Sequence, residues 1–244
     1  MNVDYQVVAS RKELVGLLEK DDFDTLVSNG CPYILPISRM KKKRYVNIHP
    51  SFLPDLRGQD PVIGSILFQR PGGATCHLMN DKIDAGDIIS QVKIPYSEDL
   101  DVSLMYQLSF IAEKQAFNLA YDKNFTVDKV QTKSQTDIYF SRDDEDRRIN
   151  FSESNDQIIR KVRAFSNKSQ GCELRIESTA YKIHQVEILT NPFLVEHASL
   201  YDDLCVILNY ENCIIFKKDN EILLFRSLTD NLSELGVGSI LSVL

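Results

Sequence analysis

The sequence predicts an α/β domain followed by a small β-rich domain. Apolar runs suited to buried strands alternate with helical patterns over the first 140 residues. Seven charges in the eight residues 141–148 then interrupt the apolar patterning, as a solvated connector does. Three further apolar runs follow, separated by short turn-forming stretches. We therefore assign one domain to residues 1–140 and a second to residues 141–244.

The first domain should begin with a helix, two strands and a second helix. Ser10 to Glu13 fits a capping box that opens the first helix. Residues 24–28 and 44–48 are short apolar runs typical of buried parallel strands, and a Gly- and Pro-containing loop at 30–36 joins them. Pro61 occupies the tolerated first-turn position of a helix that continues through Leu67.

Two more strands and a long helix complete this domain. Residues 74–79 and 88–95 are strand-like, and residues 101–121 carry apolar side chains near a 3.6-residue period. Asp99 or Asp101 can cap that helix.

The second domain is predicted to contain one helix and a group of strands. Residues 158–165 form the helical stretch. Strands are expected at 204–208, 213–216 and 221–225, because turn-forming residues separate these runs.

The overall composition argues against several classes of protein. The 244 residues carry a net charge of −7, so no global charge attracts nucleic acid or an anionic membrane. No apolar run approaches the ~20 residues that span a bilayer, and the first residues lack the layout of a secretory signal. The five cysteines form no CxxC pair, which indicates reduced thiols and no zinc site. We expect a cytoplasmic protein that does not bind a membrane.

Asn47, His49 and Asp84 are the candidate chemical residues. The strand at 44–48 runs into Asn47-Ile-His49, at the carboxyl end where open α/β sheets bind ligands. Strand alternation places Asn47 and His49 on one face. An imidazole is a suitable base near neutral pH, an amide can stabilise an oxyanion, and Asp84 can orient the imidazole. Spacing alone also fits a structural histidine and an aspartate that serves a turn.

The surrounding motifs resemble those of the folate-dependent formyltransferases, which act on methionyl-tRNA, glycinamide ribonucleotide or nucleotide-linked amino sugars. These enzymes share an Asn-x-His pair, a Ser-Leu-Leu-Pro-x-x-Arg-Gly loop, a Gly-Val-Thr strand and an Asp-(Thr/Ala)-Gly turn. The corresponding segments here are Asn47-Ile-His49, Ser51-Phe-Leu-Pro-Asp-Leu-Arg-Gly58, Gly73-Ala-Thr75 and Asp84-Ala-Gly86.

The resemblance implies a Rossmann-like catalytic domain followed by an OB-like domain. It also implies that 10-formyltetrahydrofolate is the formyl donor, that no metal takes part, and that Asn47, His49 and Asp84 are catalytic. Only 46 residues precede Asn47, fewer than in typical members, so the first strand–helix unit is expected to be missing. The residues that the resemblance assigns to the folate are Ser28, Asn29, Gly30, Tyr33, Ile34, Leu35, Pro36, Ile83 and Asp84.

The expected acceptor is the amine of a nucleotide-linked sugar. Residues 141–244 hold 12 Lys and Arg against 17 Asp and Glu, a poor surface for tRNA. The motifs resemble enzymes that formylate dTDP-linked 3- or 4-amino-dideoxyhexoses for bacterial surface polysaccharide such as the O-antigen of lipopolysaccharide. The resemblance also suggests a homodimer. The alternatives are a methionyl-tRNA formyltransferase-like enzyme and a formyltetrahydrofolate hydrolase. The residues assigned to the acceptor are Arg57, Gly58, Asp60 and His77.

Several of these residues keep a second interpretation. Arg57 can contact the sugar nucleotide or fold its loop, and His77 can face the site or be structural. The basic run Lys41–Arg44 fits a solvated edge better than a diphosphate contact. His184 and His197 are interpreted as packing or surface residues.

Overall fold

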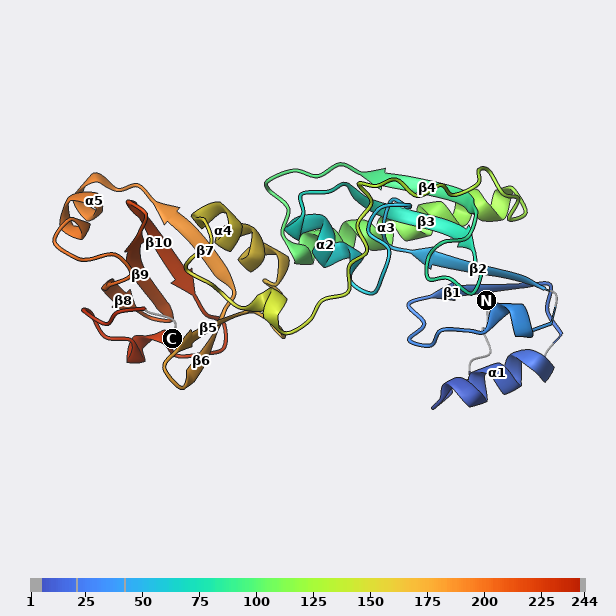
Figure 1. Ribbon diagram of the computed structural model, residues 1–244, viewed down its shortest axis with the longest axis horizontal. Coiled ribbons are helices and arrows are strands. Elements are labelled where there is room, and N and C mark those ends of the chain that lie inside the picture. The colour runs from blue at the N-terminus through green and yellow to red at the C-terminus, as the bar shows by residue number, and fades with distance from the viewer. Residues whose placement is uncertain (1–5, 21, 42, 242–244) are drawn as a thin grey trace. The chain divides into compact units, whose positions relative to one another are not determined.

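The computed structural model describes residues 6–20, 22–41 and 43–241, so Lys42 of the basic run lies outside the described residues. The chain divides into two compact units (Figure 1). One unit holds the chain up to Pro61 together with Pro71–Pro95 and Gln107–Ser141. The other holds Val62–Arg70, Tyr96–Tyr106 and the chain from Arg142 onward.

The first unit is built on a four-stranded sheet in the order β1-β2-β3-β4. Its strands are β1 (Thr25–Asn29), β2 (Arg44–His49), β3 (Gly72–Leu78) and β4 (Ile88–Ile94). The pair β1–β2 is parallel, as predicted, whereas β2–β3 and β3–β4 are antiparallel. A loop containing the short 3₁₀ helix η1 (Ile37–Arg39) joins β1 to β2.

Three α-helices alternate with these strands along the chain: α1 (Arg11–Lys20), α2 (Pro61–Leu67) and α3 (Val102–Asp122). Nearly all of α2 and the first residues of α3 belong to the other unit. The bounds predicted for α2 and α3 and the start predicted for α1 agree with the structure within a residue. Asp101 caps α3 by accepting from the Leu104 N–H at 2.8 Å. Ser10 accepts from the Glu13 N–H as a capping box requires, but the Glu13 carboxylate accepts from Ala9 instead of Ser10.

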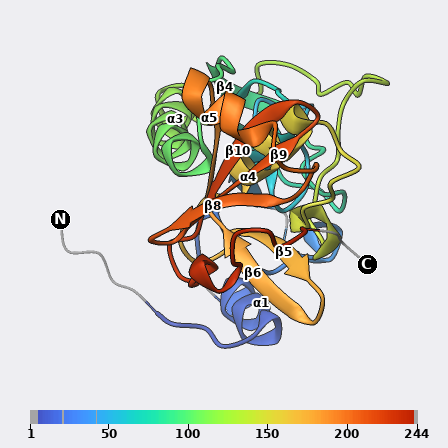
Figure 2. The ribbon, with the colours of Figure 1, turned by 90° about the vertical axis from the view of Figure 1, so that its left-hand side faces the viewer.

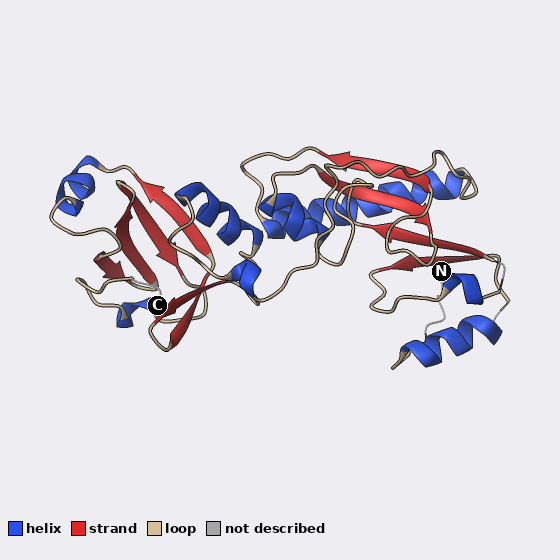
Figure 3. Cartoon of the chain, in the orientation of Figure 1, coloured by secondary structure: helices blue, strands red, loops and turns tan. Residues whose placement is uncertain are grey.

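The long helix α3 lies against one face of the sheet (Figure 3). Small side chains at Ala112 and Ala116 pack directly on Ala74 of β3. Farther along α3, Ala120 contacts the cluster that includes Val46 and Ile48 of β2. Because side chains alternate along a strand, Asn47 and His49 must project from the opposite face. The core on one face therefore fixes which face carries the polar residues.

The second unit is β-rich, as predicted (Figure 2). An antiparallel sheet has the order β7-β10-β9-β8, and β5 pairs with β6 in a separate hairpin. Phe216 and Phe225 are fully buried, with ring centroids 4.8 Å apart. The elements are η2 (Glu145–Arg147), α4 (Asn155–Ala164), β5 (Cys172–Ile176), β6 (Thr179–Ile183), β7 (Gln185–Leu189), α5 (Pro192–Ala198), β8 (Val206–Tyr210), β9 (Cys213–Lys218), β10 (Glu221–Arg226) and η3 (Leu232–Glu234).

Within the described residues, no helix combines the length and the apolar character needed to cross a membrane.

Candidate active site

Four polar side chains converge on the sheet face opposite α3. Asn47 and His49 come from β2, and His77 comes from β3, where the antiparallel register sets it directly opposite Asn47. Asp84 comes from the turn that joins β3 to β4. Its backbone φ is 49°, a left-handed conformation that aspartate tolerates better than most residues. Residues separated by 37 positions therefore meet in one cluster.

Asp84 is the centre of this cluster. One carboxylate oxygen lies 3.6 Å from His49 Nδ1, and the other lies 3.6 Å from His77 Nε2. Asn47 Nδ2 lies 3.4 Å from Asp84 Oδ1 and 3.4 Å from His77 Nε2. The Gly58 N–H donates to Asp84 Oδ2 at 3.2 Å. The carboxylate thus has polar contacts on every side supplied by β2, β3 and the loop that follows β2.

The hydrogen bonds of His49 define where it can take up a proton. Its Nε2 lies 2.9 Å from the carbonyl oxygen of Leu56, which can only accept, so Nε2 carries a hydrogen. The nitrogen that remains basic in the neutral ring, Nδ1, faces Asp84. Burial lowers the pKa of His49, while the Asp84 carboxylate and the Leu56 carbonyl oppose that decrease. The ring is therefore neutral at rest, with a counter-ion in place for its cationic form.

Asp84 remains ionised although its side chain is only 10% exposed. Burial alone would raise the pKa of Asp84, but the imidazoles of His77 and His49 and the Gly58 N–H together hold that pKa below its ordinary value. His77 Nδ1 lies 2.7 Å from the Leu78 carbonyl oxygen, so Nδ1 carries a hydrogen, and Nε2 faces both the Asp84 carboxylate and the Asn47 amide.

The loop after β2 is held by Thr75, a fully buried residue of β3. Its hydroxyl donates to the Ser51 carbonyl at 2.7 Å and accepts from the Leu53 N–H at 3.1 Å. Gln91 Nε2 donates to the same hydroxyl and to the Leu53 carbonyl. These bonds fix the loop that presents the Leu56 carbonyl to His49.

Comparison with known proteins identifies the family of this chain. Residues 5–120 match the formyl transferase family, and residues 142–229 match the formyl transferase C-terminal domain. The chain belongs to the formyltransferase family. The resemblance read from the motifs of residues 47–86 is thus confirmed.

Curated relatives of similar sequence include methionyl-tRNA formyltransferases. The methionyl-tRNA formyltransferase of Finegoldia magna is 26% identical over 184 residues, which are 73% of this chain and 59% of that protein. This chain spans only about half to three-fifths of the length of the curated relatives that it matches.

Solved structures of sugar N-formyltransferases share the fold. The enzyme from a Shewanella species has a TM-score of 0.61 and 24% identity, covering 75% of this chain and 76% of that one. The N-formyltransferase from Helicobacter canadensis, solved with folinic acid and dTDP-3-aminofucose, has a TM-score of 0.60 and 21% identity. That match covers 80% of this chain and 70% of the Helicobacter chain. At these identities the structural matches establish the fold.

A pocket of about 490 Å³ opens over this cluster of polar side chains, a volume within the usual range for small-ligand sites. The structure brings most of the predicted site residues to this pocket. Ser28 lines it from β1, where it lies beside Asn47 in the parallel register. The other predicted residues along its wall are Gly30, Tyr33, Ile34, Leu35, His49, Gly58, His77, Ile83 and Asp84.

Four predicted residues do not line this pocket: Asn29, Pro36, Arg57 and Asp60. The side chain of Asn29 projects from the other face of β1 and donates to the buried carboxyl group of Glu113 at 3.0 Å. The guanidinium of Arg57 donates to the side-chain oxygen of Gln131. Because this hydrogen bond already occupies the guanidinium, it favours the interpretation that Arg57 folds its loop over the interpretation that Arg57 contacts a sugar nucleotide.

Sequence patterns missed Gln131 entirely. Its side-chain amide donates to the carbonyl oxygens of Asp84 at 3.2 Å and Gly86 at 2.7 Å. Residues 122–140 show neither helical nor strand periodicity, so no local pattern distinguished Gln131 from its neighbours.

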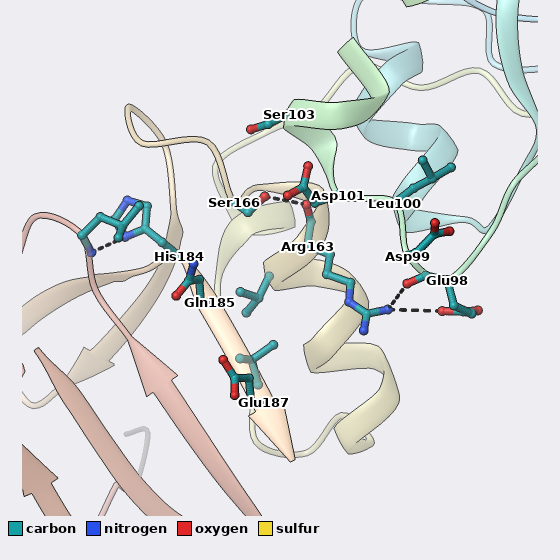
Figure 4. A pocket seen from close by; sticks show the side chains of 13 residues that line it. Glu98, Asp99, Leu100, Asp101, Ser103, Arg163, Ser166, His184, Gln185 and Glu187 are labelled. Atoms are coloured by element: carbon teal, nitrogen blue, oxygen red, sulfur yellow. Dashed lines mark hydrogen bonds and ion pairs between the residues drawn. The ribbon is translucent and has the colours of Figure 1, made fainter. Parts of the chain in front are cut away.

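A second pocket, of about 340 Å³, lies within the second unit (Figure 4). Carboxylates of Glu98, Asp99, Asp101 and Glu187 line it, and its guanidinium, that of Arg163, bonds the backbone and side chain of Glu98. This lining is predominantly anionic, and its histidine, His184, uses Nδ1 to accept from the Leu228 N–H.

Proposed function

We propose that the chain transfers the formyl group of 10-formyltetrahydrofolate to the amine of a nucleotide-linked amino sugar. The observation that carries this proposal is the cluster of Asn47, His49 and Asp84 at the wall of the 490 Å³ pocket, with His49 Nδ1 3.6 Å from the Asp84 carboxylate. The membership of the chain in the formyltransferase family supports it, and so does the Helicobacter relative, which was solved with folinic acid and an amino sugar nucleotide.

The pocket fits a flat, partly apolar donor. Tyr33, Ile34, Leu35 and Ile83 supply apolar surface, and Ser28 and Gly30 add polar and backbone groups beside the Asn47 end. When bound there, 10-formyltetrahydrofolate would supply the carbon that is transferred. The chain's own residues would then hold the donor, exclude water and handle the proton.

His49 is the proposed base. An amine must be neutral to attack and must lose a proton as the new C–N bond forms, and neutral His49 can take that proton on Nδ1. As the bond between the formyl carbon and the donor nitrogen breaks, the same proton would pass to that nitrogen, and tetrahydrofolate would leave. The resulting imidazolium would lie 3.6 Å from the ionised Asp84, which offsets the cost of a buried cation. Asp84 is thus the proposed orienting group and counter-ion.

Asn47 is the proposed stabiliser of the oxygen that becomes negative in the tetrahedral intermediate. Its amide nitrogen makes two contacts of 3.4 Å, at the long limit of hydrogen bonding. A developing oxyanion at a shorter distance would compete effectively for one of these hydrogens. Such a donor contributes a few kcal/mol to transition-state stabilisation.

The acceptor is the part of the proposal with two candidates. A methionyl-tRNA acceptor is favoured by the names of the curated relatives. Against it stands the charge of residues 141–244, where 12 basic side chains face 17 acidic ones and the net charge is −5. The charge therefore favours the amino sugar.

Several finer assignments belong to the same proposal. We assign the sugar to the dTDP-linked 3- or 4-amino-dideoxyhexoses and the product to surface polysaccharide such as O-antigen. We also assign a cytoplasmic homodimer and a division into a catalytic domain, 1–140, and a C-terminal domain, 141–244. Gly58 and His77, which line the pocket, remain the best-placed acceptor contacts.

A single assay distinguishes these acceptors. The protein is incubated with 10-formyltetrahydrofolate and, separately, dTDP-3-amino and dTDP-4-amino sugars, methionyl-tRNA, or no acceptor, and products are identified by mass spectrometry. Formylated sugar nucleotide is the expected product. Formyl-methionyl-tRNA would replace the sugar with the second candidate, and tetrahydrofolate release without acceptor would indicate a hydrolase. Absence of every product would refute formyl transfer by this chain.

A further inference from the structure

The segment of residues 123–141, which follows α3, contacts both the Asp84 turn and the loop after β2. Lys129 and Ile88, at the start of β4, exchange backbone hydrogen bonds of 2.9 and 3.1 Å. Farther on, Phe140 donates to the Arg57 carbonyl at 2.8 Å, and Arg57 donates to the Ile138 carbonyl. Gln131 lies between these two attachments and is only partly exposed.

The side chain of Gln131 connects two loops of the site. Its nitrogen donates to the carbonyls of Asp84 and Gly86, and its oxygen accepts from the Arg57 guanidinium, with Nε at 3.0 Å. Its backbone N–H also donates to the Asp87 carboxylate at 3.4 Å. One residue thus holds the turn that carries the catalytic carboxylate and the loop that follows β2.

Both loops need such a connection because their backbones are unusual. Asp84 has a positive φ, and a Cβ on Gly86 would collide with the Leu78 carbonyl oxygen. Gly58 has a φ of 112°, and a Cβ there would collide with the Phe140 carbonyl oxygen. The Gly58 N–H must nevertheless stay 3.2 Å from Asp84 Oδ2.

We propose that Gln131 is a positioning residue that holds Asp84 and its Gly58 donor in register, with Arg57 as the other end of the same clamp. Gln131 acts through Asp84 and does not line the pocket, so its loss changes turnover more than folate affinity. The kinetic part of this inference rests on the proposed formyl transfer, whereas the structural part does not.

Gln131→Glu removes the hydrogen bonds to the Asp84 turn and keeps the hydrogen bond to Arg57. Glutamate keeps an acceptor for Arg57 but has no hydrogens for the carbonyls of Asp84 and Gly86. We expect kcat to fall at least 20-fold, with KM for the folate within threefold of wild type, and the melting temperature to fall because two carbonyl groups lose their donor. The matched control is Gln135→Glu, which adds the same charge at an exposed position of the same segment.

Hydrogen exchange of the Gly58 amide, measured by NMR, tests the clamp without any turnover. Exchange should accelerate at least tenfold in Gln131→Glu and remain unchanged in Gln135→Glu. If Gln131→Glu does not fold, Gln131→Met, which lacks both donor and acceptor, takes the same measurements.

The outcomes separate this inference from the proposed function. An inactive wild type refutes formyl transfer, and Gly58 exchange then decides alone whether Gln131 positions the turn. Wild-type kcat and unchanged Gly58 exchange in the Gln131 variants would overturn the inference while leaving the proposed function intact.

Discussion

His49 and His184 are both buried, 5% and 1% exposed, yet their surroundings differ in kind. Burial lowers the pKa of each. His49 directs its basic nitrogen at a carboxylate beside a pocket. His184, between β6 and β7, uses Nδ1 to accept from the Leu228 N–H at 3.1 Å. Burial alone therefore does not distinguish the proposed base from a packing histidine, whereas a basic nitrogen aimed at an ionised partner does.

Replacing each histidine with asparagine gives the largest expected difference between them. His49→Asn removes the proposed base, so kcat should fall roughly 10³-fold, the usual scale for general acid–base groups. His184→Asn keeps an acceptor for Leu228 and should leave kcat within threefold while lowering the melting temperature. Initial rates with folate and amino sugar, together with thermal melts, make the comparison. Similar losses of kcat in both variants would contradict the assignment of His49, and not His184, as the base.

Asp84→Asn tests the partner that distinguishes the two histidines. We expect kcat to fall about 10²-fold, within the range for groups that assist proton transfer. Asp84 raises the pKa of His49, whereas His77 and Arg57, which also face it, lower that pKa. Without the carboxylate the pKa of His49 falls further, so the acid limb of the kcat/KM profile should move to lower pH. A limb that stays in place would show that another group governs it.

The sequence predicted which side chains share a face of a strand, because the alternation of side chains is a local pattern. Alternation correctly placed Asn47 and His49 on one face of β2. The same alternation explains why Ser28 lines the pocket but Asn29 reaches Glu113, although the resemblance assigned both to the folate. A contiguous run of assigned residues on a strand is necessarily divided between two faces.

Contacts between distant segments were beyond the reach of such patterns. The Leu56 carbonyl and the Gly58 N–H are backbone groups, so the pattern of side chains in the sequence cannot predict their contacts with His49 and Asp84. Gln131 meets Asp84 across 47 positions of sequence and lies in a segment without periodicity. The motifs thus predicted which of the proposed reacting groups lie together, whereas the groups that contact them could be found only in the fold.

Thr75→Val tests whether the loop around His49 needs its own support. The substitution leaves the Ser51 carbonyl and the Leu53 N–H without the buried hydroxyl, which should cost roughly 1–3 kcal/mol in the free energy of unfolding. Because the loop also carries Leu56, kcat should fall severalfold, but by less than in Asp84→Asn. Urea unfolding and initial rates measure both effects. Thr190→Val, at an exposed position, is the control, and equal losses in the two variants would contradict the assigned support.

The pH dependence of stability should show what the two histidines share. Each has a folded-state pKa below its ordinary value of about 6.5, so the unfolded chain binds more protons below that pH. The stability that depends on neutral His49 and His184 is therefore complete above pH 6.5 and is lost as pH falls through their folded pKa values. We expect a loss on the order of 1 kcal/mol for each histidine between pH 7.5 and 5.5, measured by urea unfolding. His184→Asn and His49→Asn should each flatten this dependence, whereas His197→Asn, on α5, serves as the matched control. If the free energy of unfolding keeps the same pH dependence in both variants, burial does not oppose protonation of these histidines. The property that the two are expected to share would then be absent.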